Sequence, residues 1–262
     1  FGGIPTCIQP TCALDILAIG VGGNLIFHNI KTDKTLFIFS SDLEDISHIS
    51  FQNTAKFNSV AFCGKISDIL VMDLDTRKLI CTIPSHKGGI AGIEFLIGQP
   101  ILVTAGADNK IKMWILDNPD GSARLLKSRT GHSGPTNKLR FIGNTGLSII
   151  SSSALSLRFT NCNRDEQSFE FSNGRPTKRW KSDKPVMRPT LPEIIDFSTN
   201  NSKEYFWETC VSCHRGISWV QTWNVINKTI GKKKLFSPHL KNQKPIVFSS
   251  IILVCYLVPM WE

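Results

Sequence analysis

The sequence predicts an all-β fold made of repeated units of short strands, and three observations lead to that prediction. Runs of β-branched and aromatic residues recur along the 262 residues, each bounded by Gly, Asp, Asn or Pro. Hardly any stretch has the apolar periodicity of an amphipathic helix. One kind of strand also recurs at a long, nearly constant interval, as expected when one unit is repeated along the chain.

The expected strands follow the chain in order. Ile16–Val21 and Leu25–Phe27 flank a Gly22-Gly23 turn. The later strands, which turn residues separate at roughly 8–12-residue spacing, are Ile46–Phe51, Ser59–Phe62, Ile69–Asp73, Leu79–Ile83, Ile101–Thr104, Ile111–Ile115, Leu139–Ile142 and Leu147–Ile150. Such a series favours a sandwich, a barrel or a propeller.

The long repeat decides among these architectures. In each unit one strand ends in a bulky residue that is followed by a turn and a further strand. These residues are His28, Met72, Trp114, Phe159 and Trp223, and they are separated by 44, 42, 45 and 64 residues. Repeats of ~40–45 residues with four strands each are typical of a WD-repeat β-propeller. We therefore expect about five blades of a larger propeller.

The predicted domain boundaries follow this repeat. Four blades are expected in 1–174, at about 4–40, 44–84, 88–128 and 134–172. A basic insertion covers 175–191, a fifth blade 192–241 and a divergent apolar tail 242–262. The fourth unit departs from the pattern because Ser151–Leu155 lacks the usual Asp-Gly turn. The chain begins with Phe1 and has no visible secretory signal, so we interpret it as a fragment. Because each blade depends on its neighbours, we expect the full protein to extend beyond both ends of this sequence.

The third unit carries residues suited to a buried hydrogen-bond network. His86 precedes its first strand, Thr104 ends its second, Asp108 follows and Trp114 lies in its third. A buried indole N–H needs an acceptor, which Thr104 can supply, while His86 continues the network and Asp108 fixes the imidazole tautomer. The order of these residues resembles the WD-repeat pattern in which His, Ser or Thr, Asp and Trp form a hydrogen-bonded tetrad, so we interpret the four as a structural tetrad. Gly131-His132 repeats the signal before the fourth unit.

The net charge of +9 is concentrated in the second part of the chain. Residues 1–174 contain 16 Lys and Arg against 15 Asp and Glu, whereas residues 175–262 contain 14 against 6. This asymmetry favours a surface that contacts a polyanion. The candidate RNA-contacting residues, which cluster in one Pro-containing segment, are Arg175, Lys178, Arg179, Trp180, Lys181, Lys184 and Arg188. We expect contact with phosphates rather than bases; a nuclear-localisation signal and a solvated loop remain alternatives.

A second basic group follows in the fifth unit, where no acidic residue lies between Glu208 and Glu262. Its members are Lys228, Lys232, Lys233, Lys234, Lys241 and Lys244. Lysines of this kind can neutralise phosphates beside an exposed aromatic residue that stacks on a base. A solvated surface is the alternative for this group as well.

A C-x-x-C-H sequence at Cys210–His214 matches the attachment motif of c-type haem. Residues three apart on a strand point to opposite faces, so Cys210 and Cys213 would not hold one porphyrin. No second C-x-x-C supplies the further ligands of a zinc site. We therefore expect buried thiols on a strand, with no cofactor and no metal. Eight cysteines are too dilute for a disulfide scaffold, which favours a reducing compartment.

Catalytic and membrane signatures are weak. No Ser-His-Asp order, nucleophile elbow, paired carboxylates or P-loop stands out, so we predict that the protein is not an enzyme and has no small-molecule substrate. The tail Pro245–Trp261 has 17 uncharged residues, near the ~20 needed to span a bilayer. Because Ser249, Ser250 and Pro259 interrupt it, we prefer a strand pair or a divergent end to a membrane anchor.

Three stretches are more specific than the generic repeat. They are LAIGVGGNLIFHNIK (Leu17 to Lys31), the run from Gly89 to Ser133, and TWNVINKTIG (Thr222 to Gly231). These stretches resemble the WD-repeat-containing protein 36 family, the Utp-class WD-repeat proteins of the small-subunit processome. The similarity runs from about Ile4 to Lys241 and includes the basic insertion.

The resemblance implies a tandem-propeller, non-catalytic scaffold of the UtpB subcomplex that acts in nucleolar pre-rRNA processing and small ribosomal subunit biogenesis. It implies a location in the nucleus and nucleolus, with other processome proteins, pre-rRNA and a small nucleolar ribonucleoprotein as partners. The alternative is a WD-repeat adaptor that binds only proteins in another nuclear or cytoplasmic complex. The basic insertion favours the first hypothesis.

Overall fold

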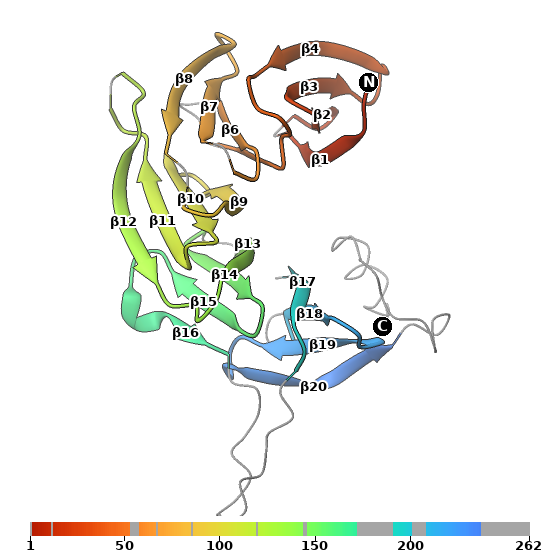
Figure 1. Cartoon of the computed structure of the whole chain (residues 1–262), viewed down its shortest axis with the longest axis vertical. Coiled ribbons are helices and arrows are strands. Elements are labelled where there is room, and N and C mark those ends of the chain that lie inside the picture. Colours follow the sequence, from red (N-terminus) through yellow and green to blue (C-terminus); the bar gives the residue numbers. More distant parts are fainter. Residues whose placement is uncertain are drawn as a thin grey trace, which may run out of the picture. The chain divides into compact units, whose positions relative to one another are not determined.

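The computed structural model describes residues 2–11, 13–52, 58–66, 68–84, 86–118, 120–143, 146–171, 191–200 and 208–236. Within these ranges the chain forms five four-stranded antiparallel sheets and no α-helix, which confirms the predicted all-β fold class (Figure 1). In the same ranges a single 3₁₀ turn, η1 (Asp165–Gln167), lies in the loop between the third and fourth strands of the fourth sheet. The basic segment from Arg175 to Arg188 and the tail 242–262 lie outside the described residues.

Each sheet contains four strands that are consecutive in the chain. The strands of the first three sheets are β1 (Pro5–Pro10), β2 (Ile16–Val21), β3 (Asn24–Asn29), β4 (Lys34–Ser40), β5 (His48–Phe51), β6 (Ser59–Cys63), β7 (Ile69–Asp73), β8 (Lys78–Ile83), β9 (Ile90–Phe95), β10 (Ile101–Gly106), β11 (Lys110–Ile115) and β12 (Arg124–Thr130). Those of the last two are β13 (Thr136–Ile142), β14 (Ser148–Ser153), β15 (Leu157–Asn161), β16 (Phe169–Glu170), β17 (Ile194–Thr199), β18 (Cys210–His214), β19 (Trp219–Asn224) and β20 (Thr229–Phe236).

The turn between the third and fourth strands is built in the same way in three sheets. The residue after the bulky repeat position accepts a hydrogen bond from the backbone N–H three residues later, over 2.8–3.3 Å; these acceptors are Asn29, Asp73 and Asn224. The left-handed backbone conformation that closes the turn falls at Asp33, Arg77 and Lys228. A short polar side chain at this position therefore starts the turn by replacing a backbone hydrogen bond.

The fourth sheet forms its inner hairpin despite lacking an Asp-Gly turn. β14 and β15 pair in register, with Ser152 opposite Leu157. The backbone N–H of Ser153 donates to the carbonyl of Ser156 over 2.8 Å, and the two hydroxyls are 3.0 Å apart. Two serines thus close a shorter turn in place of the usual one.

The chain divides into two compact units, residues 1–139 and 140–262, with the boundary inside β13. Within the first unit the first strands of successive sheets are neighbours, β1 beside β5 and β5 beside β9. The Ser50 hydroxyl of β5 accepts from the backbone N–H of Phe95 over 2.9 Å. In the second unit β17 lies beside β14, and Thr199 donates to the carbonyl of Phe141 over 3.1 Å. Side chains on the first strands therefore link one sheet to the next.

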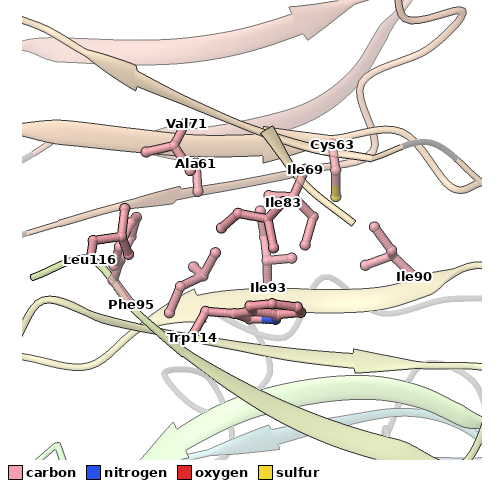
Figure 2. Close-up of a cluster of buried hydrophobic side chains, with 11 residues drawn as sticks. Ala61, Cys63, Ile69, Val71, Ile83, Ile90, Ile93, Phe95, Trp114 and Leu116 are labelled. Carbon is pink, nitrogen blue, oxygen red and sulfur yellow. The ribbon is translucent and has the colours of Figure 1, made fainter. Parts of the chain in front are cut away.

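The core lies between successive sheets rather than within one of them. One cluster joins Ile69, Val71 and Ile83 of the second sheet to Ile93 and Trp114 of the third (Figure 2). In the second unit Trp223 packs in the same way among residues of the fourth sheet, with Phe171 edge-on at 5.9 Å between ring centroids. The bulky repeat position therefore fills the space between sheets, where large aromatic side chains bury the most apolar area.

Candidate functional site

The four residues singled out in the third repeat lie together in the structure. The indole N–H of Trp114 donates to Thr104 Oγ1 over 3.2 Å, and Thr104 Oγ1 lies 2.8 Å from His86 Nε2. His86 Nδ1 lies 2.7 Å from Asp108 Oδ1. The loop before β9 supplies the imidazole, β10 the hydroxyl, the β10–β11 turn the carboxylate and β11 the indole. Four separate segments of one sheet thus meet in a single chain of hydrogen bonds.

The direction of each bond in this tetrad follows from chemistry. An ionised carboxylate only accepts, so His86 Nδ1 carries the proton that bonds to Asp108. Nε2 of the neutral imidazole is then an acceptor, and the Thr104 hydroxyl donates to it while accepting from the indole. Thr104 is fully buried and His86 is 4% exposed. Both ring nitrogens of His86 are therefore occupied, and the burial of His86 and Thr104 leaves a substrate no access to the imidazole or to the hydroxyl.

Burial controls the charge of His86. The pKa of this imidazole is lowered below its ordinary value because burial disfavours the cation, while the hydrogen bond to Asp108 acts in the opposite direction. The folded protein therefore holds His86 in its neutral form near neutral pH, the form that the bond from Thr104 to Nε2 requires.

Gly106 makes room for the imidazole in this network. A Cβ atom at position 106 would lie 2.2 Å from His86 Cβ and 2.3 Å from its Cγ. Real Cβ atoms do not approach other heavy atoms so closely, so a side chain at this position and the observed position of His86 exclude each other. Only glycine, which has no Cβ, fits beside His86 at the end of β10.

A second tetrad, which sequence reasoning missed, lies in the fifth repeat. Trp223 Nε1–H donates to Ser212 Oγ over 2.6 Å, and Ser212 Oγ lies 2.8 Å from His214 Nε2. His214 Nδ1 lies 2.7 Å from the carbonyl oxygen of Pro192. A carbonyl only accepts, so Nδ1 carries the proton, and the order of donors matches that of the third repeat. His214 is 1% exposed, and burial lowers its pKa below the ordinary value, while the hydrogen bond that Nδ1–H donates to the Pro192 carbonyl acts in the opposite direction.

The histidine of each network comes from a different position in the repeat. Leu102 pairs with Trp114 and Cys210 pairs with Trp223, so these two strand residues are equivalent. Counting on along each strand, Thr104 corresponds to Ser212 and Gly106 to His214. In the third repeat the imidazole enters from the preceding loop over a glycine. In the fifth repeat the imidazole belongs to His214, the residue that stands in place of this glycine. The loop before β17 contributes only the Pro192 carbonyl.

The fourth repeat contains only part of this arrangement. His132 precedes β13 by the same four residues that separate His86 from β9. Ser152 occupies the position of Thr104, but the tryptophan is replaced by Phe159, whose side chain has no N–H to donate. The buried Ser152 hydroxyl has no hydrogen-bond partner among the residues that the structure describes. Gly131-His132 therefore marks the start of the fourth repeat, but this repeat does not contain a complete tetrad.

The second network explains the C-x-x-C-H sequence. Cys210, Ser212 and His214 lie on the buried face of β18, whereas Cys213 lies on the other face and is half-buried. The expectation of buried thiols is therefore right for Cys210 and wrong for Cys213. His214, the residue that would be the axial haem ligand, instead bonds to Ser212 and Pro192. Burial raises the pKa of the Cys210 thiol, which keeps it protonated and a poor ligand.

Over the described ranges, no three His, Cys, Asp or Glu side chains are grouped so that they could hold a metal ion. The same ranges include no helix with the length and apolar character to cross a membrane. The candidate RNA-contacting residues from Arg175 to Arg188 have no described position, so their contact with RNA stays a prediction.

The buried histidines His86 and His214, whose pKa values are lowered, make stability depend on pH in one direction. As pH falls through the ordinary imidazole pKa of 6.5, the unfolded chain takes up protons that the folded chain does not. The contribution of the two histidines to the free energy of unfolding is therefore complete above that pH. It is lost as the pH falls towards their lowered pKa values in the folded protein. We expect urea midpoints to fall from about pH 7.5 to about pH 5, and the fall to be smaller in the double variant His86→Gln and His214→Gln. A midpoint that rises on acidification over this range would contradict the neutral networks.

Comparison with known proteins agrees with this repeat geometry. The solved structures with a similar fold include "Structure of U3-55K" (TM-score 0.65, 13% identity, 88% of this chain and 64% of that chain) and "Crystal structure of RRP9 WD40 repeats" (TM-score 0.65, 14% identity, 88% and 63%). "Crystal Structure of Mitotic Checkpoint Complex" matches at TM-score 0.64 with 10% identity over 89% of this chain and 65% of that chain. At such identities the likeness shows the fold alone. The chain is thus a WD-repeat β-propeller protein.

Sequence comparison identifies the family within this class. A family model described as the WDR36/Utp21 first beta-propeller matches residues 3–117. The relatives include "U3 small nucleolar RNA-associated protein 21 homolog" of Schizosaccharomyces pombe, 36% identical over 90% of this chain, and "WD repeat-containing protein 36" of Homo sapiens, 35% identical over 90%. The chain belongs to the WDR36/Utp21 family. It spans only 26% and 27% of the length of these two relatives.

Proposed function

We propose that the protein is a non-catalytic scaffold in small ribosomal subunit biogenesis, where it supports pre-rRNA processing in the nucleolus. The observation that carries this proposal is the similarity over 90% of the chain to a relative named for its association with U3 small nucleolar RNA. The proposed partners are the other proteins of the small-subunit processome, within the UtpB subcomplex, together with pre-rRNA and a small nucleolar ribonucleoprotein.

The geometry of the described residues supports a scaffold rather than an enzyme. The buried histidines with assigned bonds on both ring nitrogens, His86 and His214, join strands of one sheet to each other. The largest buried aromatic residues of these repeats fill the space between sheets. Polar side chains that could perform chemistry are thus used to hold a rigid platform, which is what a scaffold requires.

The basic insertion from Arg175 to Arg188 is the proposed RNA contact of this scaffold. Its charge is supplied by six Lys and Arg residues with one acidic residue, Asp183, among them. Lysine and arginine on such a segment neutralise phosphates and release counterions without the fixed geometry that base recognition needs. Trp180 adds an aromatic ring that can stack on an unpaired base.

Replacing five residues of this segment by Ser tests the contact. The variant Arg175→Ser, Lys178→Ser, Arg179→Ser, Lys181→Ser and Lys184→Ser, given an unrelated nuclear signal, is expected to reach the nucleolus but to crosslink less RNA. Small-subunit rRNA maturation should slow accordingly, as measured by the ratio of precursor to mature RNA. Undiminished crosslinking together with normal maturation would show that the segment only directs the protein to the nucleus.

A protein-binding adaptor without RNA contact is the second candidate function. The observation that favours it is the balanced charge of the first 174 residues, 16 basic against 15 acidic, which gives that part no general attraction for a polyanion. An adaptor of this kind would be recovered from cells with proteins but without pre-rRNA or small nucleolar RNA.

A further inference from the structure

The outer strand of the fifth sheet differs from the outer strands of the first three. β4, β8 and β12 each contain one extra residue relative to the neighbouring strand, and these residues are the apolar Leu36, Ile80 and Leu126. In β20 the register passes from Trp223↔Ile230 to Gln221↔Lys234. Three residues, Gly231, Lys232 and Lys233, therefore stand opposite the single residue Thr222. The fifth sheet has a wider bulge, and lysines replace the apolar residue.

The protein holds this bulge in place with several specific contacts. The backbone N–H of Lys232 donates to Glu208 Oε1 over 2.7 Å, and Thr222 Oγ1 donates to the carbonyl of Lys233 over 2.6 Å. Gln221 Nε2 donates to the carbonyl of Gly231 over 3.2 Å. A Cβ at Gly231 would lie 2.4 Å from Thr222 Oγ1, so the bulge requires glycine there. A bulge fixed in this way sets the direction in which the neighbouring side chains point.

The bulge presents charge beside aromatic rings. Lys232, Lys233 and Lys234 are exposed, and Lys234 Nζ lies 4.6 Å from the centroid of the Trp219 ring. Phe236, 59% exposed, lies 6.1 Å from Trp219 between ring centroids. The nearest acidic side chain along the sequence, Glu208, bonds to the backbone N–H of Lys232. Figure 1 shows β20 as the last strand of its sheet, and no strand of the described residues pairs with its outer edge.

From this arrangement we propose that the β20 platform, defined as Trp219, Lys232, Lys233, Lys234 and Phe236, binds single-stranded RNA. Three exposed lysines on one strand offer positive charge to the phosphates of a nucleic acid backbone. The exposed Phe236 ring, with Trp219 beside it, offers a stacking surface that needs an unpaired base. A duplex would engage the lysines but could not use the rings. The identity of the ligand as RNA rests on the proposed function, whereas the geometry of the platform does not depend on it.

Protection of a sheet edge is the other role that lysines and bulges serve. Edge protection needs a charge of either sign, whereas RNA binding needs positive charge. The variant Lys232→Glu with Lys234→Glu should therefore remain folded and unaggregated under either role, and it should lose RNA only if the platform binds RNA. Melting temperature and size-exclusion elution of this variant establish that it is folded.

The binding test uses the complete protein and a fluorescein-labelled oligouridylate of about ten nucleotides, within the site sizes usual for single-strand binders. Each single-strand phosphate contact contributes about 0.7 to the slope of log K against log salt. Lys232→Gln with Lys234→Gln should thus lower that slope by about 1.4 and weaken binding about 25-fold at about 0.1 M salt. Lys78→Gln with Lys127→Gln, which removes two exposed lysines from the outer strands β8 and β12, is the matched control and should leave both values unchanged.

The aromatic part of the platform has a different signature. Phe236→Ala should weaken oligouridylate binding about fivefold or more without changing the salt slope, and Phe236→Tyr should restore it. The same change should not affect binding of a duplex RNA. Equal losses in the control and platform variants, or an unchanged slope in Lys232→Gln with Lys234→Gln, would overturn the proposal. A loss that appears only with a polyglutamate probe would also overturn it and assign an acidic protein partner.

Failure of the platform is distinguishable from failure of the proposed function. The affinity measurement uses purified protein and no ribosomal component, so it does not depend on the pathway. If the complete protein recovers no pre-rRNA from cells but shows the predicted slopes with oligouridylate, the platform stands and the proposed function fails. If pre-rRNA is recovered but the slopes do not change, the scaffold stands and the RNA contact lies elsewhere.

Discussion

Replacing Trp114 with Ala is expected to destabilise the complete protein by about 3–5 kcal/mol, the usual loss for truncating a buried tryptophan. The indole is 7% exposed and belongs to the cluster that joins the second and third sheets. Its loss leaves a cavity between the sheets, which cannot close fully because both are held by their own hydrogen bonds. Thermal unfolding should show this as a melting temperature lower by roughly 6–20 °C.

Two further variants separate packing from hydrogen bonding at this position. Trp114→Phe retains part of the ring but removes the N–H that donates to Thr104, so it should cost less than the alanine change. Leu126→Ala on β12 truncates a side chain that is 40% exposed and should shift the melting temperature little. If Trp114→Ala melts within a degree or two of the unchanged protein, the residue does not hold the blades together.

Most strands that sequence reasoning located have a buried face, although Leu79–Ile83 belongs to the outer strand β8, which is mostly exposed or half-buried. Ile16–Val21 and Ile69–Asp73 were expected at the bounds that the structure shows for β2 and β7, and the expected Ile111–Ile115 begins one residue after the start of β11. The outer strands β4 and β12 were not located, because nearly all their residues are exposed or half-buried. Without a buried face, such a strand has no alternation of polar and apolar residues to detect. An outer strand of this kind can be expected only because the neighbouring inner strand needs a hydrogen-bonding partner.

The tetrads show where sequence reasoning reached its limit. The third repeat has His86, Thr104, Asp108 and Trp114 in the order that resembles the WD-repeat tetrad, so the sequence alone indicates the network. In the fifth repeat the imidazole comes from a strand position that is glycine in the third. The exchange becomes visible only through the strand register, which makes His214 equivalent to Gly106. The C-x-x-C-H sequence drew attention to this histidine for a reason unrelated to its role.

The basic surfaces were visible in composition but not in geometry. Charge counting identified both lysine-rich groups, because charge depends only on residue identity. The wide bulge that presents Lys232 and Lys234 depends on which residues of β19 and β20 pair. Neither the width of that bulge nor the contact with Glu208 has a sequence signal, since Glu208 lies 24 residues away from Lys232.

Recovery of RNA with the complete protein tests the central claim, that this WDR36/Utp21-family chain is part of a scaffold for small-subunit pre-rRNA processing. The protein should be tagged in cells, crosslinked with ultraviolet light and purified under denaturing conditions, and the attached RNA should be sequenced. We expect reads from pre-rRNA and a small nucleolar RNA to be enriched over a tagged WD-repeat control that binds only proteins. Equal reads from the protein and the control, with only proteins enriched in a parallel native purification, would contradict the scaffold and establish the adaptor.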